Sequence, residues 1–276
     1  PNELAQAVEY LLNKMSKKIE DRRAIDICGT GGSSLQRINT STISAFILAS
    51  LGVSIAKHGN KAASGRFGSF DLLEKLEIDL KNNKAENLKF LYAREYHPLM
   101  KHFAEVRKEI GKPTFFNLIG PLINPAQTSR QVIGTAFKDK MSLLAETCRL
   151  IGKEKVYIVC GEDGLDEVTL TGETYITELN QGKITEYKIT PKDFGLKKVE
   201  FKEIKGGDCK VNTEIAKNIL NGQCKSSHKD LVLINSALAL KLVGKVKSLK
   251  EGYSLAKNAI STGAVYEKYQ ECKTPD

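Results

Sequence analysis

The chain has 276 residues, of which 41% are hydrophobic and 27% are charged, and its formal net charge is +9. This composition is ordinary for a globular protein and gives enough chain for one large domain with a small companion. The apolar runs all fall short of the roughly 20 residues that a bilayer-spanning helix needs, and no signal segment opens the chain. We therefore expect a soluble, cytoplasmic protein with no membrane partner.

The cysteines and lysines argue against two kinds of site. The six cysteines form no C-x-x-C pair, and no histidine cluster accompanies them, which argues against zinc. The positive net charge favours anionic ligands, from nucleic acid to small phosphates. Since the lysines accompany no helix-turn-helix, zinc-finger or RNP pattern, we expect them to be solvated and expect no nucleic-acid partner.

The first part of the chain alternates helices with short strands. Residues 2–15 carry apolar side chains at helical spacing, which predicts a helix. A strand at 24–28 runs into a glycine-rich loop, and a buried helix follows at 40–52. The strand at 53–59 precedes a further helix that begins near Ser69.

The remainder continues this alternation. Residues 84–110 are expected to be mostly helical, and the apolar stretch at 115–126 is expected to be a structured loop, because glycine and prolines break it. The elements expected after it are a strand at 131–136, a helix at 141–152, a strand at 155–161, a hairpin at 173–190, and helices at 212–221, 230–243 and 249–269. The fold class is therefore α/β, with a mostly parallel central sheet flanked by helices.

Two glycine-rich loops stand close together in the sequence. Glycines let the main chain approach phosphate oxygens, and free amides at the start of a helix then face the anion. The first loop and the helix start that follows it offer Gly29, Thr30, Gly31, Gly32, Asn39, Ser41 and Thr42. A glycine run of this kind is a weak signal by itself, and the last three residues are equally suited to cap a helix.

The second loop begins where the next strand ends, which is where ligands bind in an open α/β sheet. Lys57 supplies a point charge for phosphate, and Asn60 can orient a neutral polar group. His58 alone would more often be structural. Ser64 and Ser69 continue a loop rich in hydrogen-bond donors. The two loops together make a phosphate ester the leading candidate for the ligand.

A pair of carboxylates, Asp166 and Glu167, follows the strand at 155–161. Adjacent carboxylates are costly unless a cation lies between them. Mg²⁺ suits this position, because it binds through one or two carboxylates together with substrate phosphates. The alternative interpretation is a solvated acidic turn.

The motifs DICGTGGS, NTST, KHGNKAASG, GPLINP and DGLDE occur in this order. They resemble the anthranilate phosphoribosyltransferase family, whose signature runs D-x-x-G-T-G-G-D, N-x-S-T, K-H-G-N-R-x-x-S-S, G-P-L-x-N-P and D-G-x-D-E. The similarity continues through ITPKDFGL and STGAVYEKY, so it covers nearly the whole chain. Five ordered motifs are far more specific than any one of them.

The resemblance implies a fold and a reaction. A small helical domain, at 1–18 and about 80–112, would lie beside a large α/β domain at 19–79 and 113–276, with the active site in the cleft. The enzyme would transfer the phosphoribosyl group of 5-phosphoribosyl pyrophosphate (PRPP) to the amine of anthranilate. The products would be N-(5-phosphoribosyl)anthranilate and pyrophosphate, the reaction would depend on Mg²⁺, and the pathway would be tryptophan biosynthesis.

The resemblance also implies residue roles. Ser41, Asp166 and Glu167 would ligate Mg²⁺, while Gly29, His58 and Asn60 would face anthranilate. The residues that would bind PRPP are Gly29, Thr30, Gly31, Gly32, Asn39, Ser41, Thr42, Lys57, Asn60, Ser64 and Ser69.

The chain departs from the family pattern at three motif positions. Ser33 replaces an aspartate, Lys61 replaces an arginine, and Pro113 stands where an arginine would pair with the anthranilate carboxylate. Proline offers neither charge nor donor. The chain also begins later than family members do. Because they dimerise through the helical domain, a homodimer is possible but less expected here.

Three interpretations of the function follow. The first is an active anthranilate phosphoribosyltransferase. The second keeps the PRPP site but uses a different aromatic acceptor, since loss of a carboxylate-binding arginine removes discrimination for an acid. The third is a non-catalytic paralogue that binds nucleic acid through its lysines, against which stands the retained carboxylate pair.

Overall fold

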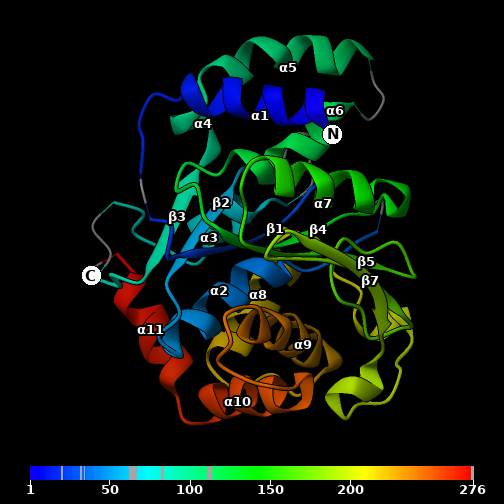
Figure 1. The fold of residues 1–276 in the computed structure, drawn as a ribbon. Coiled ribbons are helices and arrows are strands. Elements are labelled where there is room, and N and C mark those ends of the chain that lie inside the picture. The colour runs from blue at the N-terminus through cyan, green and yellow to red at the C-terminus, as the bar shows by residue number, and fades with distance from the viewer. Residues whose placement is uncertain are drawn as a thin grey trace.

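The computed structural model describes residues 1–19, 21–31, 33, 35–61, 67–81, 84–110 and 114–274, with 104, 105, 107 and 108 described by their backbone alone. Its centre is a seven-stranded sheet with the strand order β3-β2-β1-β4-β5-β6-β7 (Figure 1). The strands from β3 to β5 are parallel, and β6 and β7 add an antiparallel hairpin. The strands are β1 (Ile25–Gly29), β2 (Ile55–Gly59), β3 (Leu88–Tyr92), β4 (Arg130–Gly134), β5 (Lys155–Gly161), β6 (Thr174–Asn180) and β7 (Lys183–Ile189).

Helices cover both faces of the sheet, which confirms the predicted α/β class. In Figure 1, α7 lies above the sheet with α1 and α5 beyond it, while α2, α8, α9 and α10 lie below. The helices are α1 (Asn2–Asn13), α2 (Thr40–Ser50), α3 (Ser69–Lys75), α4 (Ala93–Tyr96), α5 (Leu99–Ile110), α6 (Phe115–Ile119), α7 (Met141–Leu150), α8 (Cys209–Leu220), α9 (Ser227–Leu242), α10 (Leu249–Ser261) and α11 (Ala264–Cys272).

The sheet separates two hydrophobic cores, and β5 shows how. Val156 and Ile158 pack with α7 and α1, whereas Tyr157 and Val159 belong to the cluster built by α2, α9 and α10. Successive side chains of a strand point to opposite faces, so a strand covered on both faces is apolar throughout. This explains why residues 156–160, VYIVC, include no charged side chain.

The expected helix at 84–110 is wrong for Leu88–Tyr92, which forms β3 at the edge of the sheet. Leu88 and Phe90 are buried, whereas Lys89 between them is exposed. That alternation is the period of a strand. Helical structure starts only at Ala93 and is interrupted at His97 and Pro98 between α4 and α5.

The stretch at 115–126 is more regular than expected. Phe115–Ile119 form α6, and Gly120–Ile123 continue it as a 3₁₀ turn. Pro121 lies at the start of that turn, where its missing N–H removes no intrahelical hydrogen bond. Asn124 follows the turn, and its buried side chain donates a hydrogen bond to the carbonyl oxygen of Ala56 over 2.8 Å.

The last expected helix, 249–269, consists of two helices. Gly263 has a φ of +82° between α10 and α11. This left-handed conformation favours glycine and ends a helix. The hairpin at 173–190 is confirmed as β6 and β7, with Gln181 and Gly182 between the strands.

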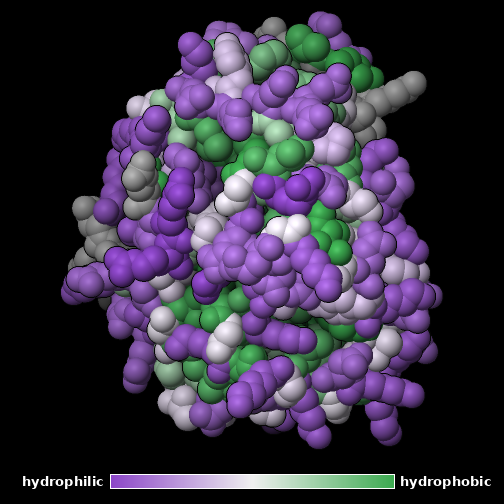
Figure 2. All heavy atoms as spheres, in the orientation of Figure 1, coloured by the Kyte–Doolittle hydropathy of each residue, from purple (hydrophilic) through white to green (hydrophobic). Residues whose placement is uncertain are grey.

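The surface is mostly hydrophilic on the face shown in Figure 2, with hydrophobic side chains near the top, in the region of α5 and α6. Exposed apolar residues there are Phe103, Val106, Ile110 and Phe115. None of the helices in the described ranges has the length and apolar character to cross a membrane. The division into a small and a large domain stays a prediction, and β3, within 80–112, belongs to the central sheet.

Candidate active site at the carboxyl ends of β1, β4 and β5

The order of the parallel strands reverses between β1 and β4. The chain leaves β1 toward α2 on the lower face and leaves β4 toward α7 on the upper face (Figure 1). Ligands of open α/β sheets bind at the carboxyl ends of strands beside such a reversal. The two strands separate just after Thr30, whose N–H still donates to the carbonyl oxygen of Gly134 over 2.7 Å.

The turn after β5 is organised by Asp163. One of its carboxylate oxygens accepts hydrogen bonds from the hydroxyl groups of Thr169 and Thr171 at 2.6 and 2.7 Å, and the other accepts the N–H of Leu165 at 3.0 Å. Gly164 has a φ of +86°, which permits the tight reversal. Asp163 therefore stabilises the turn, and the carboxylates of Asp166 and Glu167 are not needed for that purpose.

Asp166 fits against two glycines. A side chain at Gly134 would overlap the backbone carbonyl of Asp166, and one at Gly29 would overlap its carboxylate. The absence of a Cβ at Gly29 thus gives the Asp166 carboxylate its place beside the first glycine loop. The predicted phosphate loop and the predicted metal-binding turn are therefore in contact.

Asp166 is ion-paired with Arg37, a residue that the sequence interpretation missed. The Asp166 side chain is fully buried, whereas that of Arg37 is 31% exposed. A buried carboxylate needs a compensating partner. The available signal was that Arg37 is the only charged residue between Asp26 and Lys57.

Glu167 is buried beside α2, and its Oε1 atom accepts no hydrogen bond within the part of the chain that the structure describes. Burial raises the pKa of Glu167 to about 8, against the opposing effect of Arg37. A hydrogen bond from Thr40, the first residue of α2, also acts to lower the pKa of Glu167. Two further buried oxygen atoms at the start of α2, Asn39 Oδ1 and Thr42 Oγ1, have no partner among the described residues. Unsatisfied buried oxygens are rare in folded proteins and call for an explanation.

Asn39 occupies the position before α2, but its side chain does not cap the helix. Its Nδ2 atom donates to the carbonyl oxygen of Phe67 at 3.3 Å instead. The first N–H groups of α2 are therefore not satisfied by a side-chain cap, as an anion-binding helix start requires. Ser41 lies half-buried in this first turn.

Lys57 lies beneath the strand ends, at 3% exposure. Its ammonium group donates to the carbonyl oxygen of Ile27 at 3.1 Å. Burial raises the pKa of Asp26, and the charge of Lys57 opposes that rise. Asp26 also accepts hydrogen bonds from Gln131 Nε2 at 3.0 Å and from the N–H of His58 at 3.2 Å. The expected direct contact between Lys57 and phosphate stays a prediction.

The carboxyl end of β2 carries two of the three residues expected to face the acceptor, His58 and Asn60, while Gly29 ends the neighbouring strand β1. Asn60 is exposed, and its carbonyl oxygen accepts the Ser69 hydroxyl at 3.2 Å. His58 is buried and packs edge-on against His97, with ring centroids 5.4 Å apart. His97 was not predicted as a site residue, since nothing in its helical surroundings indicated a partner 39 positions earlier.

This histidine pair predicts acid sensitivity. Burial lowers the pKa of His58 to about 3, and burial also lowers the pKa of His97. Because the unfolded chain takes up protons near pH 6.5 and the folded chain does not, stability is complete above pH 6.5 and falls below it. We expect the free energy of unfolding to drop by about 1.4 kcal/mol per pH unit for His58 alone between pH 6.5 and 5.

Urea unfolding of the wild type and of His58→Gln at pH 7, 6 and 5 measures this effect. Glu167, whose pKa burial raises to about 8, acts in the opposite direction over this range, because the folded chain binds its proton first. It does so in both proteins, so the difference between their slopes reports His58. The variant should lose less stability on acidification than the wild type. Equal slopes would contradict the expectation for His58.

Several predicted residues can be placed only partly. Gly32, Ser64 and Pro113 lie outside the described residues. Gly31 has a φ of +69°, and among the described residues no atom lies within 4 Å of the place that a Cβ would take. Ser33, which replaces the family's aspartate, is buried.

The predicted Mg²⁺ ligands would fill only part of the coordination sphere of the metal. Within the described ranges no group of three or more His, Cys, Asp and Glu side chains is placed to hold a metal ion. Asp166, which is paired with Arg37, and Glu167 do provide two adjacent buried carboxyl groups. This donor set suits Mg²⁺, which takes its other ligands from water and substrate phosphates.

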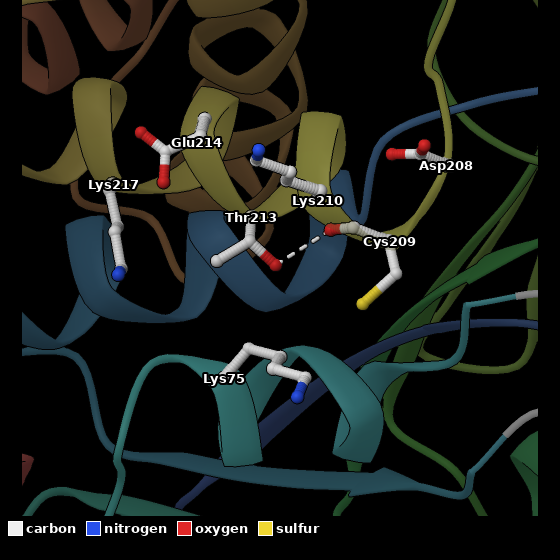
Figure 3. A pocket seen from close by; sticks show the side chains of 7 residues that line it. All are labelled: Lys75, Asp208, Cys209, Lys210, Thr213, Glu214 and Lys217. Carbon is white, nitrogen blue, oxygen red and sulfur yellow. Dashed lines mark hydrogen bonds between the residues drawn. The ribbon is translucent and has the colours of Figure 1, made fainter.

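A separate groove of about 510 Å³ lies between α3 and α8 (Figure 3). It is lined by Lys75, Asp208, Cys209, Lys210, Thr213, Glu214 and Lys217. None of the predicted site residues that the structure describes lines it, and the carboxylate pair lies elsewhere. The strand ends therefore remain the candidate active site.

Comparison with known proteins identifies the family of the chain. Residues 21–266 match the family model described as the glycosyl transferase family, a/b domain. The anthranilate phosphoribosyltransferase of Dictyoglomus thermophilum is 41% identical over 97% of this chain and 82% of its own length. That of Persephonella marina is 42% identical over 96% of this chain and 81% of its own length.

Solved structures give the same result. The anthranilate phosphoribosyltransferase of Thermus thermophilus superposes with a TM-score of 0.88 at 37% identity, over 98% of this chain and 83% of that one. The Saccharomyces cerevisiae enzyme in complex with PRPP and Mg gives a TM-score of 0.86 at 28% identity, over 97% and 78%. The ordered motifs, the sheet and these similarities lead to one conclusion: the chain belongs to the anthranilate phosphoribosyltransferase family.

Proposed function

We propose that this protein transfers the 5-phosphoribosyl group from PRPP to anthranilate in tryptophan biosynthesis, with Mg²⁺ and in the cytoplasm. The observation that carries the proposal is the position of the buried Glu167 carboxyl group, which lies beside Thr40 at the start of α2 and beside the Arg37–Asp166 ion pair. A divalent cation would offset the two carboxyl groups, and a ligand with several anionic oxygens would pair with Arg37 and with the N–H groups at the start of α2. The family relationship supplies the identity of that ligand.

The reaction needs positioning and charge stabilisation more than covalent work by the protein. As the bond from ribose to pyrophosphate breaks, positive charge develops on the ribose ring and negative charge on the leaving pyrophosphate. The N–H groups at the start of α2 and the loop at Gly29 and Thr30 would hold the phosphates. Asp166 and Glu167 would hold Mg²⁺, which offsets the phosphate charge when bound.

The acceptor would approach from the carboxyl end of β2, where Asn60 is exposed and His58 lies buried beside His97. A neutral His58 offers one N–H donor and one acceptor. A hydrogen bond with the backbone of Gly120 holds the ring in place. His58 would therefore support the acceptor site from beneath.

Isothermal titration of the protein with PRPP, with and without Mg²⁺, tests the first half of the proposal. We expect saturable binding that Mg²⁺ strengthens. Fluorescence of anthranilate in the same sample then reports turnover, and EDTA should stop it. Absence of PRPP binding would refute the proposed function.

A different aromatic acceptor remains the alternative, because Pro113 stands at the expected arginine position. The discriminating assay measures pyrophosphate release with anthranilate and with aniline, which lacks the carboxylate. A preference for anthranilate supports the proposal. PRPP-dependent release that proceeds equally well with aniline would support the alternative.

A further inference from the structure

The backbone around Arg37 is held by hydrogen bonds from residues 206–212, which are distant in the sequence. The carbonyl oxygen of Gln36 accepts the N–H of Gly206 at 3.0 Å, and that of Arg37 accepts Asn212 Nδ2 at 3.1 Å. Asn212 is 3% exposed and is itself fixed, because its Oδ1 accepts the N–H of Gly207 at 2.9 Å. A side chain at Gly206 would overlap the backbone of Arg37. The position of Arg37 is therefore closely specified.

The guanidinium group of Arg37 has donors to spare. One nitrogen, Nη1, pairs with the Asp166 carboxylate, and the side chain forms no other hydrogen bond or ion pair with the described residues. An arginine carries five N–H donors in a planar fork that matches phosphate oxygens. Because its side chain is 31% exposed while Asp166 is fully buried, the remaining donors lie on the open side of the pair.

The surroundings favour an anion at those donors. Arg37 follows the first glycine loop and lies three residues before the first residue of α2, so its side chain adds a charge where the N–H groups of α2 already favour an anion. Lys57, the other nearby cation, is buried and donates to Ile27. Arg37 is thus the accessible positive charge of this loop.

We propose that Arg37 is a phosphate-binding and positioning residue, which holds the Asp166 carboxylate with one nitrogen and binds the pyrophosphate group of PRPP with its remaining donors. This inference rests on the proposed function. It assigns Arg37 two partners at once, so that ligand and metal-binding carboxylate are placed relative to one another by a single side chain.

Titration calorimetry with PRPP and Mg²⁺ on Arg37→Met and Arg37→Lys tests the inference. Loss of charged hydrogen bonds should weaken PRPP binding about 10- to 100-fold in Arg37→Met. Arg37→Lys keeps the charge but loses the fork, so it should recover part of the affinity. Arg149→Met is the matched control, because Arg149 forms a surface ion pair with Glu146 on α7 and should bind PRPP as the wild type does.

A second variant separates position from charge. Gly206→Ala keeps the guanidinium group but pushes against the backbone of Arg37, so it should also weaken PRPP binding. In steady-state kinetics both changes should raise KM for PRPP and lower kcat, and leave KM for the acceptor nearly unchanged. Thermal unfolding of each variant verifies that it is folded.

The outcomes are distinguishable. If the wild type binds no PRPP, both the proposed function and this inference are refuted. If the wild type binds PRPP and Arg37→Met binds it equally well, only the inference is wrong. Equal losses in Arg37→Met and Arg149→Met would also overturn it, because the effect would then be unspecific.

Discussion

Replacing Glu167 by glutamine should remove activity without unfolding the protein. The amide has the shape of the carboxyl group but cannot supply the negative oxygen that Mg²⁺ prefers. We expect kcat/KM to fall by about 100-fold or more, in line with the loss of a metal-binding group. Pyrophosphate release measured over a series of Mg²⁺ concentrations would show a weakened dependence on the metal.

Unlike its activity, the stability of the Glu167→Gln protein is not expected to fall. Glu167 is buried and its carboxyl group has an unpaired oxygen, so a neutral amide there should leave the melting temperature unchanged or raise it. Glu162→Gln is the control, because Glu162 lies in the same turn but is exposed. Full Mg²⁺-dependent activity in Glu167→Gln would exclude the metal-binding role.

Replacing Gly134 by alanine should have the largest effect on the fold. The new Cβ would overlap the backbone carbonyl of Asp166, so the whole turn at 163–167 must shift. Overpacking of this kind costs about 3 kcal/mol. Urea unfolding should show that loss, and the fluorescence assay should show little turnover, because the carboxylate pair no longer faces the glycine loop.

Gly120→Ala is the matched control for stability. Gly120 has a φ of −48° and no atom within 4 Å of the position that a Cβ would take. Alanine is favoured over glycine in helical conformations, so this variant should be more stable by about 0.5 to 1 kcal/mol. A Gly134→Ala protein as stable as wild type would show that the turn can move freely.

The candidate site was predictable to the extent that its residues lie in short motifs beside strands. Gly29 and Asp166 could be identified because Gly29 ends one apolar run and Asp166 lies in the turn after another, and the ends of parallel strands meet at one edge of the sheet. Their actual contact, carboxylate against glycine, depends on packing between β1 and the turn after β5. No periodicity in the sequence encodes that contact.

Arg37 and β3 were missed for different reasons. The position of Arg37 depends on Asn212, 175 residues away, so its role is set by tertiary contacts. The strand LKFLY has a local signal, but five residues between helical patterns are too short to separate the two periods. Pairing with β2 decides the outcome there.

The enclosed ammonium group of Lys57 has a consequence for catalysis. A lysine on the surface would have to leave its water shell and settle around each arriving substrate, and that rearrangement costs free energy during the reaction. Lys57 is already held by the carbonyl oxygen of Ile27 and near Asp26. Its field at the strand ends is therefore constant, and the polar floor of the site needs no reorganisation when charge separates above it.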